Sequence, residues 1–379
     1  MDFKLSKEHE LARQMFRQFA ETELAPIATE IDEEERFPLE TVEKLKKLGM
    51  LGIPYPKKYG GQGCDELTYS LMMEEISRCC ASTGIIASVH TSLCCGALYQ
   101  NGTEEQKEKY LRPLLDGRYL GAFGLTEPSA GSDAASQNTF AVKDGDSYIL
   151  NGSKIFITNS GYADVYTIFA MTDKSQGTRG ISCFIVEKGF EGFTQGTPFR
   201  KMGIRAACVR ELIFQNVRVP AENLLGKEGR GFGIAMKALD GGRIGIASQA
   251  VGIAQGAFDK TVTYVKERKQ FGKPLAALQN TQFTLADMAT RIQAARLLTW
   301  EAAMAADAGE PYSSKAAMAK LFASETASYI TNRAVQMMGG YGYMREYSVE
   351  RMMRDAKITE IYEGTSEIMK MVISGQLLK

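Results

Sequence analysis

A glutamate near the C-terminus has a setting that could make it a proton acceptor. Glu363 lies in the segment IYEGTSE (361–367), beside a glycine and within an apolar, helix-rich tail. Burial there would raise the pKa of its carboxyl group, and a raised pKa suits a general base that works near neutrality. A surface carboxylate preceding a helix would have the same local sequence, so this segment alone leaves both interpretations open.

A second segment, FGLTEPSAGSD (123–133), combines glycines, hydroxyl side chains and a proline. Glycines let backbone N–H groups approach a planar or phosphorylated ligand, and hydroxyls supply directed hydrogen bonds. The same composition is typical of a capped loop, so a ligand-binding segment and a plain loop are both possible at this point.

Other chemistries find little support in the sequence. The chain has two histidines, and its seven cysteines form no C-x-x-C pair with zinc spacing, so we expect no metal site and no Ser-His-Asp triad. The cysteines fit small buried side chains that stay reduced. No G-x-G-x-x-G follows an expected strand, and no P-loop motif occurs. The nearest glycine cluster, GRGFG (229–233), opens an expected helix with the wrong spacing.

The elements that must position these segments fall into three regions, which predict an α+β multidomain fold. Residues 1–120 show helical periodicity, including a capping box that starts at Thr103. Residues 121–227 predict a small antiparallel β-barrel or sandwich, with a hairpin turn at Asn151-Gly152 and strands over 165–171, 181–186 and 211–214. Residues 228–379 predict a four-helix bundle with helices over 244–268, 276–308, 313–338 and 345–371.

Bulk properties exclude several classes of protein. Lys+Arg and Asp+Glu both number 45, so no net charge attracts a polyanion, and we expect no nucleic-acid partner. No uninterrupted apolar stretch is long enough to span a bilayer, and the N-terminal residues show neither a secretory signal nor a presequence. We therefore expect no membrane association and a cytoplasmic location, or a matrix location after processing.

Taken together, the two segments and others along the chain resemble the acyl-CoA dehydrogenase family. The resemblance covers nearly the whole chain, and its motifs follow the order of the family. They are YGG (59–61), FGLTEPSAGSD (123–133), LNGSK with FIT (150–154, 156–158), KMGIR (201–205), DGGR (240–243), RKQFG (268–272), QMMGGYG (336–342), and RDA leading into IYEGT (354–356, 361–365). So many motifs in order make the match very specific.

The resemblance implies FAD as cofactor and a homotetramer, a dimer of dimers, with the three-region fold. It implies that Thr126 and Thr158 hydrogen-bond the polar edge of the isoalloxazine ring and tune it as a hydride acceptor. The other residues that it places along the ring are Phe123, Leu125, Gly131, Ser132, Phe156 and Ile157.

A further set of residues is implied to reach the FAD of a neighbouring subunit. Arg268 would face the pyrophosphate, where a fixed cation suits an anion, although a surface ion pair is its plain alternative. The rest of this set is Gln279, Gln336, Met337, Gly339 and Gly340, of which the last four also fit a helix that stops at glycine. Phe271 is implied to bind FAD as well. Thr365 and Glu367 would contact the adenosine half of FAD, and Ser132, Asp240, Arg243, Tyr362 and Gly364 would contact the acyl-CoA.

The implied reaction converts butyryl-CoA to crotonyl-CoA, or runs in reverse. Glu363 would remove the α proton while the β hydrogen leaves as hydride to flavin N5. The enolate-like oxygen needs directed donors, which the family takes from a flavin ribityl hydroxyl and from the backbone N–H of the catalytic glutamate. Gly364 would let that backbone approach closely.

Two positions narrow the subfamily. Isovaleryl-type relatives carry the base at the position of Gly242, and glutaryl-type relatives carry an arginine near Gly84, but neither charged residue is present here. The segments 79–84 and 361–369 look most like those of short-chain, butyryl-CoA enzymes in fatty-acid β-oxidation.

The resemblance also implies electron-transferring flavoprotein as the redox partner. The alternatives are a dehydrogenase of another chain length, an acyl-CoA oxidase, or a catalytically silent flavoprotein scaffold subunit. Anaerobic bleaching of the flavin by an acyl-CoA would separate an enzyme from a scaffold.

Overall fold

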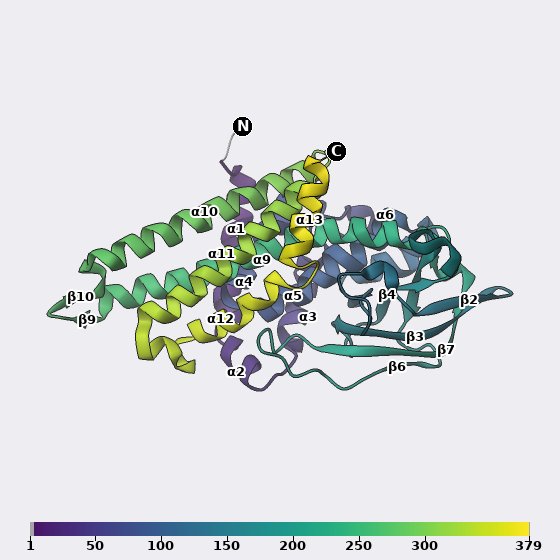
Figure 1. Cartoon of the computed structure of the whole chain (residues 1–379), viewed down its shortest axis with the longest axis horizontal. Helices are drawn as coiled ribbons and strands as arrows, with labels where there is room; N and C mark the ends of the chain where they lie inside the picture. Colours follow the sequence, from purple (N-terminus) through teal and green to yellow (C-terminus); the bar gives the residue numbers. More distant parts are fainter. Residues whose placement is uncertain (1–3, 379) are drawn as a thin grey trace.

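The computed structural model of the chain describes residues 4–378, and it is helical at both ends of the sequence with a β-sheet region between them (Figure 1). The α+β architecture expected from the sequence is thereby confirmed. The N-terminal helices are α1 (Lys7–Phe19), α2 (Ala28–Glu33), α3 (Leu39–Lys47), α4 (Glu66–Cys79), α5 (Ala81–Ser88), α6 (Gly96–Asn101), α7 (Glu104–Gln106) and α8 (Arg112–Leu115). The predicted capping box is present, because Thr103 accepts from Gln106 N while the Gln106 side chain accepts from Thr103 N.

The middle region is an eight-stranded sheet whose main path runs β6-β7-β3-β2-β4-β5-β8. Most neighbours are antiparallel, but β1 pairs with β4 in parallel, Gly121 opposite Val165. The sheet is therefore mixed rather than purely antiparallel. Its strands are β1 (Gly121–Gly124), β2 (Phe140–Asp144), β3 (Ser147–Thr158), β4 (Val165–Met171), β5 (Ile181–Glu187), β6 (Phe193–Gln195), β7 (Val209–Pro220) and β8 (Leu224–Leu225).

The hairpin expected at Asn151-Gly152 is wrong, because β3 runs through this dipeptide as one strand. Asn151 pairs with Phe140 of β2, and Gly152 pairs with Phe214 of β7 across a β-bulge. Gly152 has a φ of 136°, and a Cβ there would lie 2.6 Å from Thr139 Oγ1. Gly152 thus allows a bulge and the close approach of Thr139, and it does not form a tight turn.

The C-terminal region is built on three long helices that lie along the molecule's long axis (Figure 1). They are α9 (Gly231–Glu267), α10 (Gln279–Asp307) and α11 (Ser313–Met338), followed by the shorter α12 (Val349–Lys357) and α13 (Ser366–Leu377). A small hairpin, β9 (Lys269–Gln270) and β10 (Lys273–Pro274), joins α9 to α10. Helix α9 packs against both α4 and α11, so the helices from the two ends of the sequence share one apolar core, while the sheet has its own.

The single helix expected over 345–371 is also wrong, because it is broken between α12 and α13. Glu363 and Gly364 have φ values of 53° and 100°, a left-handed conformation that ends a helix. Thr365 then caps α13 by accepting from Ile368 N at 3.3 Å. The break places Glu363 on a turn rather than on a helix face.

One continuous segment of the described residues, Ala81–Asn101, is long and apolar enough to span a bilayer, contrary to our expectation that none would be. The most apolar part of this segment is fully buried inside the protein. It therefore packs as core helix, and its composition reflects contact with other helices on every side.

Candidate active site

The carboxylate of Glu363 is buried although the backbone around it is partly exposed. Neither of its two oxygens has a hydrogen-bond partner among residues 4–378. Loss of hydration raises the pKa of this carboxyl group to about 7, and the nearby cations Lys320 and Arg243 partly offset the effect. An unpartnered buried carboxylate is costly, so its presence indicates a group kept for chemistry rather than for stability.

Gly242, in the interior of α9, faces this carboxylate. A Cβ at position 242 would lie 2.0 Å from Glu363 Oε2 and 2.8 Å from Leu93 Cδ2. No side chain larger than hydrogen fits there while Glu363 keeps its place. A side chain at position 242, where isovaleryl-type relatives carry their base, would therefore enter the space that the Glu363 carboxylate occupies.

Asp240 and Arg243, predicted to contact the acyl-CoA, lie one turn apart on α9 and pair with each other. Arg243 Nη1 donates to Asp240 Oδ1 at 2.6 Å, and Ser313 Oγ donates to the same oxygen at 2.9 Å. Arg243 is only 5% exposed, and its Nε atom has no partner. The guanidinium is close enough to Glu363 to stabilise its charged form, so the structure brings these residues together around one point.

Tyr362 and Gly364 flank the carboxylate but make different contacts. The Tyr362 hydroxyl donates to Gln249 Oε1, and Gln249 Nε2 donates to Ala81 O at 2.8 Å. Tyr362 thus ties the turn to α9 and α5. Gly364 O accepts from Lys320 Nζ at 2.7 Å.

Sequence reasoning missed Lys320. This lysine is fully buried on α11, and burial lowers the pKa of its ammonium group to about 8. The available signal was a single lysine on a helix face otherwise built of small residues: Ala316, Ala317, Ala319 and Ala323 are all buried. A lone charge in such a stripe indicates a specific buried partner.

The predicted flavin-ring residues lie on two segments that the sheet holds side by side. Ile155 N donates to Thr126 O at 2.8 Å, which joins the segment after β1 to the end of β3. Phe123, Leu125 and Ile157 are buried, whereas Thr126 and Thr158 are partly exposed, as expected for groups that meet a ligand.

Phe156 is the unusual member of this group. Its side chain is 64% exposed, and its backbone has a φ of 60°, which a bulky residue rarely adopts. An exposed aromatic ring held in a strained backbone conformation fits a surface that a planar cofactor covers. Gly131 and Ser132 are exposed beyond it, and a Cβ at Gly131 would meet no atom within 4 Å.

A second residue that sequence reasoning missed stands behind these segments. Lys154, with none of its surface exposed, donates from Nζ to Leu125 O at 3.1 Å, Glu127 Oε1 at 2.7 Å and Gln137 Oε1 at 2.9 Å. All three of its donors are used. Lys154 belongs to the LNGSK motif, but the alternation of side chains along a strand does not predict its burial, because β3 contains bulges.

The residues predicted to reach a neighbour's FAD gather at the opposite end of the molecule. Arg268 ends α9 and lies over the Tyr341 ring, 5.3 Å from its centroid. The β9–β10 hairpin carries Phe271, which is 90% exposed, and it projects at the end of the long axis remote from β2, β3 and β7 (Figure 1). The rest of this set lies at helix ends: Gln279 begins α10, and Gln336, Met337, Gly339 and Gly340 surround the end of α11.

One chain therefore does not bring the two predicted FAD-binding groups together. Thr365 and Glu367, assigned to the adenosine half, lie at the start of α13, apart from the hairpin. The group on the sheet and the group around Arg268 can serve one cofactor only if each comes from a different chain.

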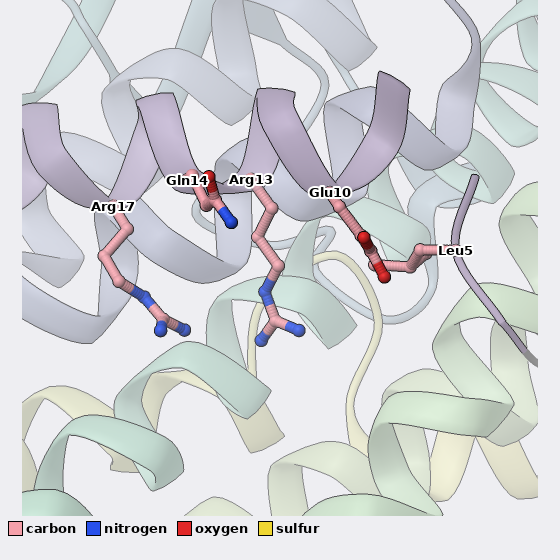
Figure 2. Close-up of a pocket in the computed structure, with 5 residues that line it drawn as sticks. All are labelled: Leu5, Glu10, Arg13, Gln14 and Arg17. Atoms are coloured by element: carbon pink, nitrogen blue, oxygen red, sulfur yellow. The ribbon is translucent and has the colours of Figure 1, made fainter. Parts of the chain in front are cut away.

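The two arginines that line a surface hollow on α1 hold this helix to its neighbour. It is lined by Leu5, Glu10, Arg13, Gln14 and Arg17, and Figure 2 shows the two arginine side chains extending from α1. Arg13 contacts Glu74 and Glu75 at 2.7 Å, and Arg17 contacts Glu75 at 2.9 Å. These ion pairs hold α1 to α4, and none of the predicted site residues takes part.

Comparison with known proteins identifies the family. Models of the acyl-CoA dehydrogenase N-terminal, middle and C-terminal domains match residues 6–118, 122–217 and 229–378. The chain belongs to the acyl-CoA dehydrogenase family. The family is FAD-dependent, and the exposed Phe156 surface together with the unpartnered Glu363 carboxylate fits that cofactor and its substrate.

Three relatives are similar over their full length. A short-chain-specific acyl-CoA dehydrogenase of Clostridium acetobutylicum is 58% identical, with all of both chains covered. The butyryl-CoA dehydrogenase structure of Megasphaera elsdenii is 51% identical with a TM-score of 0.98 and full coverage of both chains. A chain in a study of the electron-transferring flavoprotein of Acidaminococcus fermentans is 54% identical with a TM-score of 0.99, again with full coverage of both chains.

Proposed function

We propose that this chain is a short-chain acyl-CoA dehydrogenase that oxidises butyryl-CoA to crotonyl-CoA with Glu363 as the catalytic base. The observation that carries the proposal is the buried carboxylate with two unpartnered oxygens and a pKa of about 7. Such a group takes a proton readily at neutral pH. The similarity to short-chain and butyryl-CoA enzymes supports the substrate class.

In this proposal the sheet residues hold the cofactor, and the turn at Glu363 carries out the proton transfer. When bound, FAD would supply a hydride acceptor, and Thr126, Phe156 and Thr158 would hold it on the sheet side. Glu363 would remove the α proton of the thioester, and its backbone N–H, on the left-handed turn at Glu363 and Gly364, would donate to the developing enolate-like oxygen. Burial of the carboxylate excludes the water that would otherwise compete for the proton.

The remaining assignments complete the cofactor and substrate sites. Phe123, Leu125, Gly131, Ser132 and Ile157 line the flavin segments, and Ser132, Asp240, Arg243, Tyr362 and Gly364 serve the acyl-CoA. Arg268, Phe271, Gln279, Gln336, Met337, Gly339 and Gly340 serve the FAD of a neighbouring subunit, and Thr365 and Glu367 its adenosine half.

The proposal includes the assembly and the partner. A cofactor site shared between two chains, as a homotetramer that is a dimer of dimers would contain, is supported by the separation of the two FAD-binding groups within one chain. Electron-transferring flavoprotein as the redox partner is supported by the similarity to a chain from a study of that protein. A cytoplasmic location is supported by the seven cysteines, none of which forms a disulfide.

The deciding experiment is anaerobic reduction of the FAD-loaded protein by acyl-CoAs of graded length. We expect the yellow absorbance to bleach fastest with the four-carbon butyryl-CoA. Fastest bleaching with a longer acyl chain would reassign the chain length, and rapid reoxidation by O₂ would indicate an oxidase. If no acyl-CoA bleaches the flavin, the enzyme assignment is wrong and a scaffold role is favoured.

A further inference from the structure

Lys320 makes a single direct contact with the turn that carries the base. Its Nζ atom donates to Gly364 O at 2.7 Å from the interior of α11. Gly364 follows Glu363, and both residues have the left-handed backbone that breaks the helix. A buried ammonium therefore holds the peptide group directly after the base, in a stretch where the backbone conformation is unfavourable for a glutamate.

The charges around Lys320 come from three elements. Arg243 lies on α9, Glu360 on the short turn after α12, and Glu363 and Glu367 at or near the start of α13. Lys320 and Arg243 both oppose the effect of burial on Glu363, and Arg243 is already paired with Asp240. Lys320 therefore supplies a positive charge near the base that is not engaged in the Asp240 pair.

We propose that Lys320 is a positioning residue for the base, which holds the Gly364 carbonyl and keeps the Glu363 carboxylate ionised once the acyl-CoA has entered. The second role follows from solvation. The buried carboxylate has already lost its hydration, which disfavours its charge, and a bound acyl chain would keep water out; a fixed cation in such a dry site opposes that effect. This inference rests on the proposed function.

The test is the pH dependence of turnover in Lys320→Met. Methionine has a similar length and carries no charge, so it removes the cation while largely keeping the packed volume. We expect the pH of half-maximal kcat to move upward by about one unit or more, and kcat at pH 7 to fall about tenfold, with KM and FAD content little changed. The matched control is Lys315→Met on the same helix, a partly exposed lysine that pairs with Glu301 and Glu310 and should leave the kinetics unchanged.

A second readout isolates deprotonation from hydride transfer. In 3-thiabutyryl-CoA, sulfur replaces the β carbon, so loss of the α proton gives an anion that cannot pass on a hydride. Its charge-transfer absorbance with the flavin can be titrated with pH. We expect a higher titration midpoint in Lys320→Met than in the parent enzyme.

Lys320→Gln separates the two roles, because glutamine keeps a donor for Gly364 O but loses the charge. We expect it to fold and hold FAD, with the raised midpoint of Lys320→Met; it also replaces that variant if methionine costs the protein its FAD. Parent-like midpoints and kcat in Lys320→Gln and Lys320→Met would overturn the proposal. A parent enzyme that neither bleaches with butyryl-CoA nor forms the charge-transfer band would instead overturn the proposed function.

Discussion

At position 363 two physical requirements oppose each other. A base must be ionised to accept a proton, yet the same carboxylate must lose its water so that it meets the substrate rather than solvent. The structure balances the two requirements. Burial raises the pKa of Glu363 to about 7, while Lys320 and Arg243 oppose a further rise. Near neutrality the group is therefore available in both protonation states, as reversible proton transfer requires.

Replacing Glu363 with glutamine tests this role directly. We expect Glu363→Gln to keep FAD and butyryl-CoA binding, because shape is preserved, while kcat falls by about 10³-fold or more through loss of the base. Anaerobic flavin reduction in single turnover measures the chemical step. A variant that reduces its flavin at nearly the parent rate would show that another group removes the proton.

The same substitution should change how stability depends on pH. The folded protein binds a proton at Glu363 more tightly than the unfolded chain does, since the pKa rises from 4.5 to about 7. The parent's free energy of unfolding should therefore fall as pH rises from about 4.5 to 7, by up to about 3 kcal/mol, and Glu363→Gln should lack this loss. Urea unfolding of the two FAD-loaded proteins at pH 5.5 and 8 measures it; a difference between them that does not grow with pH would contradict the expectation.

Gly242 gives a steric test of the same carboxylate. In Gly242→Ala the added Cβ would lie 2.0 Å from Glu363 Oε2, so the carboxylate must move. We expect kcat to fall at least about tenfold, as small displacements of catalytic groups do, with FAD retained. Gly241→Ala is the control, since a Cβ there meets no atom within 4 Å. Equal activity in the two variants would mean that the position of the carboxylate is not critical.

At the scale of elements, the site depends on irregular backbone. Glu363 lies on a break between two helices, and Phe156 has a positive φ near the end of a strand. Sequence periodicity predicted α11 to the residue and α10 to within about three residues, because their buried faces repeat regularly, but it placed the start of α9 at 244 instead of Gly231. It failed at 345–371 and at Asn151-Gly152, because helix and turn propensities carry no information about a distant contact such as Thr139 against Gly152 or Lys320 against Gly364.

Lys154 links the two flavin segments, and its removal should weaken the cofactor site. In Lys154→Met the Leu125 carbonyl loses its donor and the buried Glu127 carboxylate loses its cation. We expect FAD to bind at least about tenfold more weakly, measured by flavin fluorescence during titration of the apoprotein. Lys143→Met, at an exposed position of β2, should bind FAD as the parent does. Parent-like affinity in Lys154→Met would limit Lys154 to a role in folding.

At the scale of the whole molecule, the family resemblance predicted features of the FAD site that composition and periodicity could not. Composition and periodicity predicted three regions and their order, whereas the assignment of Arg268 and Phe271 to FAD came from motif similarity alone. In the structure the β9–β10 hairpin, which directly follows Arg268 and carries Phe271, lies at the end of the long axis remote from β3 (Figure 1). No property of one sequence states which surfaces of two copies meet, so an intersubunit site is invisible to periodicity.

Subunit complementation tests this arrangement. Arg268→Ala and Glu363→Gln should each be nearly inactive alone, the first through weakened FAD binding and the second through loss of the base. Co-expressed, they should regain activity, because a mixed dimer contains one site with its own Glu363 and the neighbour's Arg268 intact. The activity of mixed tetramers, isolated by two different affinity tags, measures this. No recovery would place both residues in the same site of one chain.

Helix α9 has one further consequence. It begins against Ser182 of β5, passes Gly242 and Arg243 in its interior, and ends at Arg268. Its 37 residues correspond to about 55 Å of rigid rod. Gln249, beyond Arg243 on this rod, accepts from Tyr362 and so belongs to the chain's own reaction centre. Under the proposed intersubunit site, only the stretch between Gln249 and Arg268 would set how far one chain extends towards the cofactor of the next.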